Sequence, residues 1–295
     1  MLNIIIVNYN SGNHLRDCLE AIHRNINGKE DYDITVYDNG STDHSLETAK
    51  DAFADVKYIG NHTNFGFARA ANQAISATRG RYILLLNPDV LLFPGTIERM
   101  IEFMDKNQKC GILGAEILSP AGFRQPTCRR FPDYFNILFG RRSLIRRIFP
   151  RNPFSNSYLY LDMDYNKAEM VDFVEGSVMM LRRSALDEVG LFDEDFFLYV
   201  EDADLCYRMQ QKGWQVWWLP RTYAIHYRGE NFRRDNIHPA IHHSKGFYRF
   251  FKKHYAPSGL MHLLLRILLG LRLAYVVSTE SVKKILNDIN FSPPK

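Results

Sequence analysis

Polar residues follow four apolar runs of strand length in the first third of the chain, and their types suit the binding of a small ligand. In chain order, the four runs lead to Asn8, Tyr9 and Asn10; to Asp38; to Asn64 and Gly66; and to Asn87 and Asp89. Taken singly they have ordinary explanations, since Asp38 alone could form a turn. The carboxyl ends of parallel strands meet at one edge of a sheet, so their coincidence predicts a binding site at that edge.

The chemistry available at this edge suits a nucleoside diphosphate. The carboxylate of Asp38 can accept a hydrogen bond from a pyrimidine N–H or a ribose hydroxyl, and the helix start around 64–68 offers backbone N–H groups to phosphate. The sequence contains no G-x-G-x-x-G after the first run and no G-x-x-x-x-G-K-[ST]. It therefore gives no support to dinucleotide or P-loop chemistry.

The segments that must position these residues alternate between strand-like and helical patterns. This alternation predicts an α/β fold with a mainly parallel central sheet flanked by helices. Strands are expected at 2–7, 33–38, 56–60, 81–87, 110–118, 177–183 and 215–220. Helices are expected at 41–53, 65–80, 94–106 and 184–190, with Gly80 ending the second, and a further helix should start near Glu201.

Composition places the chain among ordinary globular proteins. The 295 residues are 46% hydrophobic, which is ample for a core, and a formal net charge of +4 gives no support to nucleic-acid binding. Four cysteines stand far apart without a C-x-x-C pair, which argues against a zinc knuckle or a disulfide framework. The start of the chain lacks a signal-peptide pattern, so the cytoplasm is the expected compartment.

Six segments in a fixed order carry a resemblance to a known family. They are "IIIVNYNSGNHLRDCLEAI", "VYDNGSTDHS", "NHTNFGFARAANQA", "LLLNPDV", "FVEGSVMMLRRSALDEVGLFDEDFFLYVEDADLCYRMQQKGW" and "AIHYRGEN". In combination they resemble the family 2 inverting glycosyltransferases of the GT-A fold, especially the bacterial branch that includes rhamnosyltransferases. The resemblance spans residues 2 to about 231. It is specific for the family and only weakly specific for the sugar.

The resemblance assigns donor-binding roles to residues of the first half of the chain. It implies that Asn8, Tyr9 and Asn10 line a nucleoside pocket and that Asp38 reads the pyrimidine. The segment that passes close to the donor in such enzymes contributes Asn64, Gly66, Phe67, Ala68 and Asn72.

The resemblance also implies a divalent cation, Mg²⁺ or Mn²⁺, beside the donor diphosphate. Asp89 matches the last acid of the metal-binding DXD-type motif, and Asn87, counted with the donor-binding residues, stands where the first carboxylate would be. One carboxylate and two diphosphate oxygens are few ligands for such a cation. His226 resembles a histidine that supplies a further ligand in some relatives, although a lone histidine is about as often structural.

On the acceptor side, the acids after "FFLYV" are the main signal. The resemblance implies that Asp202 removes the acceptor's proton and that Glu201 orients the acceptor. The alternative is an acidic first helical turn favoured by the helix dipole, with Asp204 and Arg208 as an i,i+4 pair.

Two further features are expected near the acceptor. The resemblance places the turn at Glu175 and Gly176 beneath the acceptor, with Gly176 allowing close backbone approach. Trp218 could stack on an acceptor sugar, whereas large aromatic residues in such a strand more often belong to the core.

The chain divides into a catalytic domain and a tail. Within a GT-A domain at 1–231, we expect a nucleotide-sugar-binding half at 1–118, a variable basic excursion at 119–172 and an acceptor half at 173–231. Residues 232–295 form a helical tail.

Two segments predict contact with a membrane surface. Five arginines among large apolar residues at 141–151 suit an anionic membrane surface or a lipid diphosphate, although such a run is usually a solvated face. The apolar stretch 259–278 is long enough to span a bilayer, but its two arginines favour a helix lying in the interface. A helix that forms a homodimer is the alternative.

These observations predict an inverting, metal-dependent glycosyltransferase at the inner face of the cell membrane. It would move one sugar from a UDP- or dTDP-sugar, with dTDP-rhamnose the best single donor, to a saccharide acceptor linked to polyprenyl diphosphate, in cell-surface polysaccharide synthesis. A nucleotidyltransferase is disfavoured because a glycine-rich, basic phosphate loop is missing after the first strand. A non-catalytic sugar-nucleotide or glycan-binding module would lose Asp89 or Asp202, and both are present.

Overall fold

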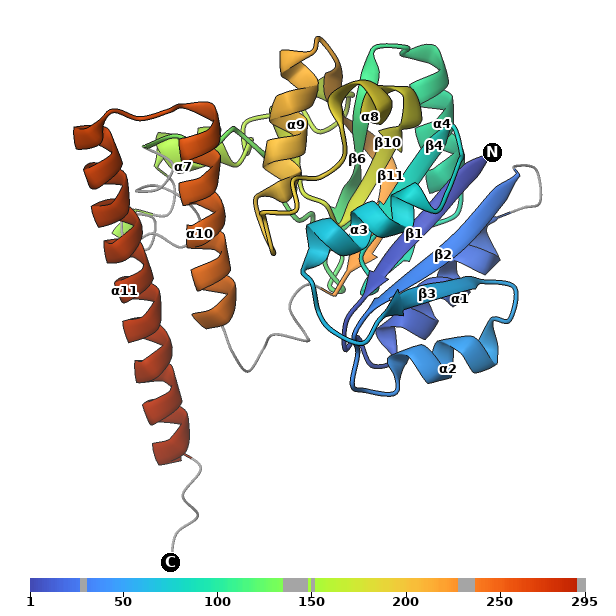
Figure 1. The fold of residues 1–295 in the computed structure, drawn as a ribbon, viewed down its shortest axis with the longest axis horizontal. Helices are drawn as coiled ribbons and strands as arrows, with labels where there is room; N and C mark the ends of the chain where they lie inside the picture. Colours follow the sequence, from blue (N-terminus) through green and yellow to red (C-terminus); the bar gives the residue numbers. More distant parts are fainter. Residues whose placement is uncertain (27–30, 135–147, 150–151, 228–236, 291–295) are drawn as a thin grey trace, which may run out of the picture.

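The computed structural model describes residues 1–26, 31–134, 148–149, 152–227 and 237–290. Figure 1 shows a twisted sheet with helices on both faces, and a helical hairpin from the C-terminal part of the chain standing beside it. The predicted fold class, a mainly parallel sheet flanked by helices with a helical tail, is confirmed.

Four parallel strands form one side of the sheet and bring their carboxyl ends to one edge. They are β1 (Leu2–Asn8), β2 (Tyr32–Asn39), β3 (Lys57–Asn61) and β4 (Tyr82–Leu86), in the order β3-β2-β1-β4. Asn8 lies opposite Asp38, and Asn39 lies opposite Asn61. The predicted common edge is therefore present.

The other side of the sheet is mixed. It contains β6 (Cys110–Leu118), β10 (Val178–Arg182), which is antiparallel to both β4 and β6, and β11 (Gln215–His226), which is parallel to β6. A short strand that we did not predict, β5 (Val90–Leu92), pairs antiparallel with β11. We also expected the last strand to end at 220. Instead β11 continues to His226 after an irregular register near Arg221, whose φ is +60°.

Two cores lie on opposite faces of the sheet because successive side chains of a strand point to opposite sides. Ile4 and Ile6 belong to the core shared with α1 (His14–Asn25), α2 (Ser45–Ala52) and α4 (Thr96–Lys106). Ile5 and Val7 belong to the core shared with α3 (Phe67–Ser76), α8 (Arg183–Val189) and α9 (Glu201–Gln211).

Two predicted helix boundaries are wrong. The helix α3 ends at Ser76, and Gly80 lies beyond it, where its N–H donates to the side chain of Asn3 and a Cβ would collide with that side chain. The helix α2 begins at Ser45 rather than 41. The carboxylate of Asp43 accepts the N–H of Ser45 at 3.1 Å and that of Gly12 at 2.8 Å, which holds the preceding residues in a loop.

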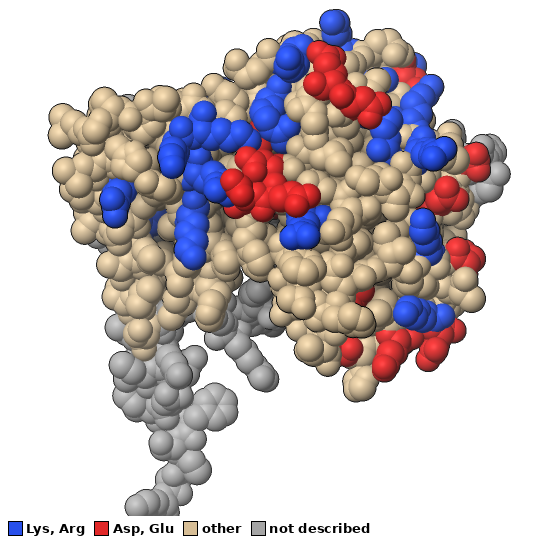
Figure 2. All heavy atoms as spheres, in the orientation of Figure 1, with Lys and Arg blue, Asp and Glu red and all other residues tan. Residues whose placement is uncertain are grey.

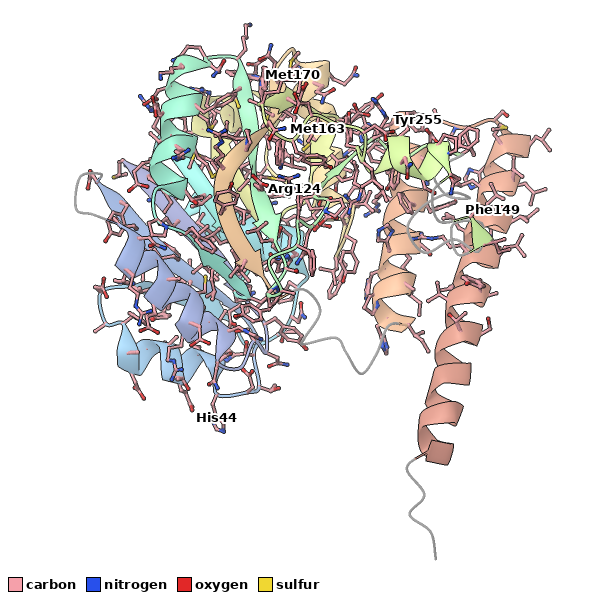
Figure 3. The ribbon with its side chains drawn as sticks, turned by 180° about the vertical axis from the view of Figure 1, so that it is seen from behind. His44, Arg124, Phe149, Met163, Met170 and Tyr255 are labelled. Carbon is pink, nitrogen blue, oxygen red and sulfur yellow. The ribbon has the colours of Figure 1, made fainter. Side chains whose placement is uncertain are left out.

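The described parts of the segment 119–172 include one short strand that joins the main sheet and one that forms a separate two-stranded sheet. It contains β7 (Cys128–Arg129), α7 (Pro153–Tyr158) and β8 (Glu169–Met170); β8 pairs with β11, and β7 pairs with β9 (Phe173–Val174). Viewed from behind, Figure 3 shows Arg124, Met163 and Met170 on the side of the sheet that β6 and β11 form. The arginines of the basic cluster at 141–151 lie outside the described residues.

The tail forms two helices, α10 (Ile237–His254) and α11 (Gly259–Asn290), and charges tie α10 to α9. The buried carboxylate of Asp204 lies 2.8 Å from Nε of Arg208, which confirms their predicted pairing. Lys253 Nζ and His254 Nε2 from α10 each lie 2.7 Å from the same carboxylate. Figure 2 shows lysine and arginine side chains beside acidic ones where the hairpin meets the rest of the molecule.

Candidate active site

The carboxyl edge of β1 and β2 is held by an amide that bonds to a carboxylate. Asn8 is 0% exposed, and its Nδ2 donates to Oδ1 of Asp38 at 2.8 Å. The other oxygen of Asp38 accepts the backbone N–H of Ser41 at 3.0 Å. These two hydrogen bonds hold the carboxylate of Asp38 in place. Asp38 is 6% exposed, so only a small part of it reaches the surface.

The residues that follow Asn8 join two loops at the rim of this edge. Asn10 adopts a φ of +50°, and its side-chain oxygen accepts the N–H of Thr42 at 2.7 Å. Its own N–H donates to Oγ of Ser41 at 3.0 Å. Tyr9 is 42% exposed and stands at the opening. Asn10 therefore holds the two loops together, and the side chain of Tyr9 is the one in this group that a ligand could reach.

Asn39, which follows Asp38 at the end of β2, orders the next loop through contacts that the sequence did not reveal. Its side chain donates to Oδ1 of Asn64 at 2.9 Å and accepts the N–H of Phe65 at 3.1 Å, while Asn64 Oδ1 also accepts the N–H of Gly66 at 2.8 Å. Gly66 has a φ of +86°, and a Cβ there would collide with the backbone of Phe197. The glycine is required by both its conformation and this close approach.

Three predicted donor-segment residues bond or pack inside the protein. The N–H of Phe67 donates to the carbonyl of Phe197 at 2.8 Å. The side chain of Asn72 exchanges two hydrogen bonds with the backbone of Phe192, at 2.9 and 3.0 Å, and Ala68 is buried in the core. These contacts fasten α3 to the loop that precedes α9.

The unpredicted strand β5 brings Asp89 and His226 together. Val90 pairs with His226, which places His226 Nε2 3.2 Å from Oδ1 of Asp89. Both side chains are largely buried. Burial raises the pKa of Asp89, but the hydrogen bond and charge of His226, with the charge of His14 farther away, outweigh it and hold the pKa below its ordinary value.

The pair fits two ligands of one cation. Adjacent ligands on an octahedral Mg²⁺ or Mn²⁺ with bonds near 2.1 Å lie about 3.0 Å apart, close to the separation of Asp89 Oδ1 and His226 Nε2. The described residues contain no cluster of three or more His, Cys, Asp or Glu side chains suited to a metal. Within the described ranges, Asp89 and His226 are thus the two side chains at this edge that could hold a cation.

Asp202 lies in the first turn of α9, after a strained stretch of backbone. Tyr199 and Val200 have φ values of +70° and +75°, which non-glycine residues rarely adopt, and such strain is common at functional sites. The carboxylate of Asp202 accepts the N–H of Gly176 at 3.2 Å and that of Ala203 at 2.8 Å.

Glu201 and Asp202 differ in how strongly their surroundings favour the protonated form. Burial raises the pKa of Asp202, and the backbone N–H groups and the positive charge of Arg129 oppose that rise. Burial and the negative charge of Asp202 raise the pKa of Glu201 well above its ordinary value. Within the described part of the chain, Oε2 of Glu201 is buried without a hydrogen-bond partner. Of the two, Asp202 is therefore the side chain that loses its proton more readily, while Glu201 is held in the protonated form.

Arg129 is a residue that the sequence did not reveal. Its guanidinium is almost fully buried, donates to the carbonyls of Pro126 and Cys128 at 2.8 and 2.7 Å, and forms an ion pair with Glu175. It lies in β7, within the segment that has no clear periodicity, so no pattern pointed to it. Arg129 gives the acceptor side a buried positive charge next to its carboxylates.

The three residues expected near the acceptor have different surroundings. Gly176 donates its N–H to Asp202. A Cβ at this position would lie 3.9 Å from the nearest atom, so a larger residue would fit and no close approach requires a glycine here. Glu175 pairs with Arg129. Trp218 is 1% exposed and packs edge-on against Tyr165, which places it in the core, as the alternative explanation had it.

Two hydrogen bonds connect the loop that contains Asp89 to Asp202. The N–H of Asn87 donates to the carbonyl of Ser177 at 3.0 Å, and Gly176, one residue earlier, bonds to Asp202. Asn87 is half-buried and lies two residues before Asp89. The end of β4 thus connects to the acid of α9 through a single turn of chain.

Comparison with known proteins identifies the family. The model for glycosyl transferase family 2 matches residues 3–190, more than half of the chain. The chain belongs to this family. The related model for glycosyl transferase family group 2 matches residues 151–275, which extends the glycosyltransferase match into α11.

Among curated members of glycosyl transferase family 2, two rhamnosyltransferases are similar over most of their length. The N-acetylglucosaminyl-diphospho-decaprenol L-rhamnosyltransferase of Mycobacterium tuberculosis is 28% identical over 266 residues, covering 86% of this chain and 85% of that protein. Rhamnosyltransferase WbbL of Escherichia coli is 25% identical over 261 residues, covering 86% and 93%. The predicted resemblance to the rhamnosyltransferase branch is confirmed.

Solved structures of glycosyltransferases share the fold, which is the GT-A fold. The mannosyltransferase PcManGT from Pyrobaculum calidifontis, in complex with GDP-Man and Mn²⁺, matches with a TM-score of 0.58 at 14% identity, covering 99% of this chain and 76% of that one. TarS from S. aureus, in complex with UDP-GlcNAc, matches with a TM-score of 0.58 at 16% identity, covering 94% and 72%.

Proposed function

We propose that this glycosyltransferase is inverting and metal-dependent, and moves one sugar from a UDP- or dTDP-sugar to a saccharide acceptor carried on polyprenyl diphosphate. The proposed donor is dTDP-rhamnose, and the proposed setting is cell-surface polysaccharide synthesis. The single observation that carries the proposal is a pair of hydrogen bonds: the N–H of Asn87 donates to the carbonyl of Ser177, and the N–H of Gly176 donates to the carboxylate of Asp202. They support a site in which a base faces a diphosphate held near Asp89.

The relatives support the donor and the acceptor. Both full-length relatives are named as rhamnosyltransferases, which favours a rhamnose donor. The mycobacterial relative is named for an acceptor linked through diphosphate to a polyprenol, which favours the same kind of acceptor here. The exposed Tyr9 and the rim of Asp38 are the proposed contacts for the nucleoside.

The proposed reaction is a single in-line displacement. The acceptor hydroxyl attacks C1 of the donor sugar from the face opposite the nucleotide, so a new C1–O bond forms as the bond to the diphosphate breaks. Asp202 takes the hydroxyl proton, and protonated Glu201 donates a hydrogen bond to the acceptor. Asp89 and His226 would hold the cation, which supplies positive charge to the departing diphosphate.

The proposed location is the cytoplasmic face of a membrane. Gly259–Thr279 is long and apolar enough to cross a bilayer, with a mean hydropathy of 1.8, although length and composition alone are weak grounds for a span. Its arginines make an interfacial position the better proposal. The apolar side chains of this helix that face outward support contact with lipid: Leu260, Leu263, Leu264, Ile267 and Leu271.

The function is tested by supplying the purified protein with a panel of nucleotide sugars, Mn²⁺ or Mg²⁺, and N-acetylglucosaminyl-diphospho-polyprenol. We expect release of dTDP from dTDP-rhamnose, and a product whose anomeric configuration, determined by NMR, is opposite to that of the donor. Chelation with EDTA should stop turnover.

Three outcomes would contradict the proposal in different ways. Release of pyrophosphate instead of a nucleoside diphosphate would indicate the rival nucleotidyltransferase. A product with retained anomeric configuration would contradict the proposed role of Asp202 as the base. Binding of donor without turnover on any lipid-linked saccharide would favour a sugar-nucleotide-binding module.

A further inference from the structure

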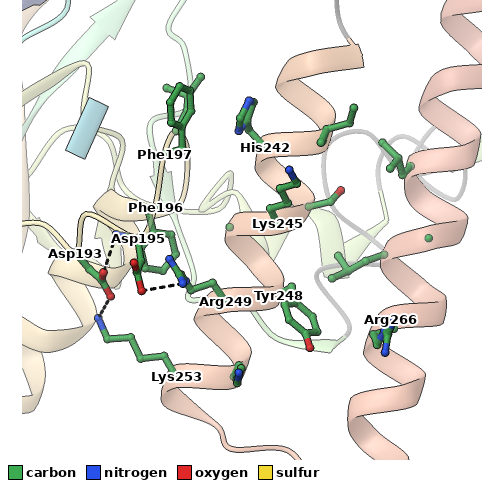
Figure 4. A pocket seen from close by; sticks show the side chains of 18 residues that line it. Asp193, Asp195, Phe196, Phe197, His242, Lys245, Tyr248, Arg249, Lys253 and Arg266 are labelled. Carbon is green, nitrogen blue, oxygen red and sulfur yellow. Dashed lines mark hydrogen bonds and ion pairs between the residues drawn. The ribbon is translucent and has the colours of Figure 1, made fainter. Parts of the chain in front are cut away.

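A groove of about 1150 Å³ lies between the helical hairpin and the loop that leads into α9 (Figure 4). We call it the hairpin groove. The loop 193–198 forms one wall, and α10 and α11 form the other. It lies apart from the Asp89–His226 pair, so no step proposed above uses it.

The hairpin groove carries positive charge without matching acids. Lys245 and Lys252 lie two turns apart on one face of α10, and Arg266 faces them from α11. All three are exposed, and across the described ranges no ion pair involves any of them. The two aspartates of the opposite wall are already paired, Asp193 with Lys253 at 2.6 Å and Asp195 with Arg249 at 2.8 Å.

His242, which lines the hairpin groove, is affected by the charge of Lys245. Burial and the positive charges of Lys245 and His238 lower the pKa of His242, whose ring stacks on Phe197 at 4.8 Å between centroids.

The remaining lining is apolar and continues onto the outer face of α11. Phe196, Leu269 and Leu273 line the groove. At 3.6 residues per turn, the groove-lining positions of α11 adjoin the face that bears Leu263 and Ile267, which are 56% and 50% exposed. An apolar chain could therefore run from the exposed face of α11, beside Arg266, into the groove.

One wall of the hairpin groove reaches the proposed active site. Phe197 lines the groove, and its carbonyl accepts the N–H of Phe67 in the donor-binding segment. The same loop leads within five residues to Asp202. A molecule seated in the groove would lie beside the loop that sets the position of the proposed base.

We propose that the hairpin groove binds the diphosphate and the adjoining isoprenoid units of a polyprenyl-diphosphate-linked acceptor. The proposal rests on the proposed function, since it names where that acceptor is held. Lys245, Lys252 and Arg266 bind the two charges of the diphosphate, and Leu269 with Leu273 contact the first isoprenoid units. The acceptor sugar then extends past Phe197 toward Asp202.

The test measures binding of the full-length protein to phosphatidylcholine vesicles by flotation. One set contains undecaprenyl diphosphate, and a second contains phosphatidylglycerol at the same negative surface charge. We expect the protein to prefer the diphosphate vesicles. The triple variant Lys245→Gln, Lys252→Gln, Arg266→Gln should lose this preference, with affinity for diphosphate vesicles falling on the order of 100-fold, about fivefold for each cation.

A matched variant controls for net charge. Lys57→Gln, Lys109→Gln, Lys212→Gln removes the same charge from exposed positions outside the groove and should keep the preference. All six positions are exposed, so both variants should fold, which thermal melting checks. Arg266→Gln alone should produce an intermediate loss.

Two results would overturn the inference. Equal binding to both vesicle types by the unaltered protein would identify an unselective site for phospholipid headgroups, and an undiminished preference in the triple variant would place the diphosphate elsewhere. Calorimetry with dTDP-rhamnose separates this failure from failure of the proposed function. If the protein binds the donor but does not prefer the diphosphate vesicles, the proposed reaction stands and only the proposed role of the hairpin groove is refuted.

Discussion

The donor edge and the acceptor side of the active site are held by different chemistry. At the donor edge, neutral amides bond across the ends of regular parallel strands, as Asn8 does to Asp38 and Asn39 to Asn64. On the acceptor side, buried charges from irregular segments hold the site, with Arg129 paired to Glu175 and Glu201 next to Asp202. Because these buried acids lie against one another and near Arg129, turnover should depend on the protonation of Glu201 and Asp202.

The largest effect is expected at Asp202. Asp202→Asn removes the proposed base and should lower kcat by roughly 10²- to 10⁴-fold, because general-base catalysis contributes about that much. The donor Kd, measured by calorimetry, should stay within about twofold, since transition-state and donor contacts are separate. Asp51→Asn, at an exposed position on α2, is the matched control. Retention of more than a tenth of the activity would refute the assignment.

The next largest effect concerns the attachment of the tail to the acceptor side. Asp204→Asn leaves Arg208, Lys253 and His254 around an uncharged group and should lower the free energy of unfolding by about 3 kcal/mol, measured by urea denaturation at pH 7.

The same site predicts a pH dependence of stability. Burial raises the pKa of Asp204, but His254, Arg208 and Lys253 outweigh it and lower the pKa to about 2. Because the folded pKa lies below the ordinary value of 3.8, this stabilisation is present above about pH 4 and is lost as the pH falls from 4 toward 2. The variant should therefore lose less stability than the unaltered protein over that range. A parallel decline in both proteins would rule out this role.

A smaller effect is expected at the Asp89–His226 pair. His226→Gln should weaken donor binding in Mn²⁺ by about 10- to 100-fold and leave donor binding in EDTA unchanged, because only the metal-dependent part is lost. His44→Gln is the control, since His44 is exposed and points away from the molecule in Figure 3. Equal weakening with and without the metal would indicate a structural role for His226.

The smallest expected effect is a displacement of the pH profile. The charge of Arg129 opposes the raised pKa of Asp202, so Arg129→Gln should raise that pKa further and move the acidic limb of kcat/KM to higher pH. On that acidic limb, kcat/KM at a fixed pH should fall about tenfold if the pKa of the base rises by one. Arg129→Lys keeps the charge and should restore the profile. A uniform loss at all pH values in the Gln variant would mean that Arg129 only supports packing.

The strand–helix order and the donor edge were predictable because they depend on local pattern. Alternating apolar runs placed β1, β2, β4 and β6 close to their observed bounds, and parallel pairing then aligned the strand ends. The short strand β5 and the end of β11 were not predictable, since a three-residue run carries no period and the irregular register near Arg221 interrupts the alternation.

The amino-acid sequence by itself determined the family, the parallel core and which acids and amides reach the edge of the sheet, because these follow from residue order and the period of the backbone. Only the tertiary structure decided which partners those residues meet. It set Asp89 beside His226 and buried Arg129 against Glu175. It also formed the hairpin groove between the helical hairpin and the loop that leads into α9. Such contacts join segments far apart in the chain, and local periodicity holds no information about them.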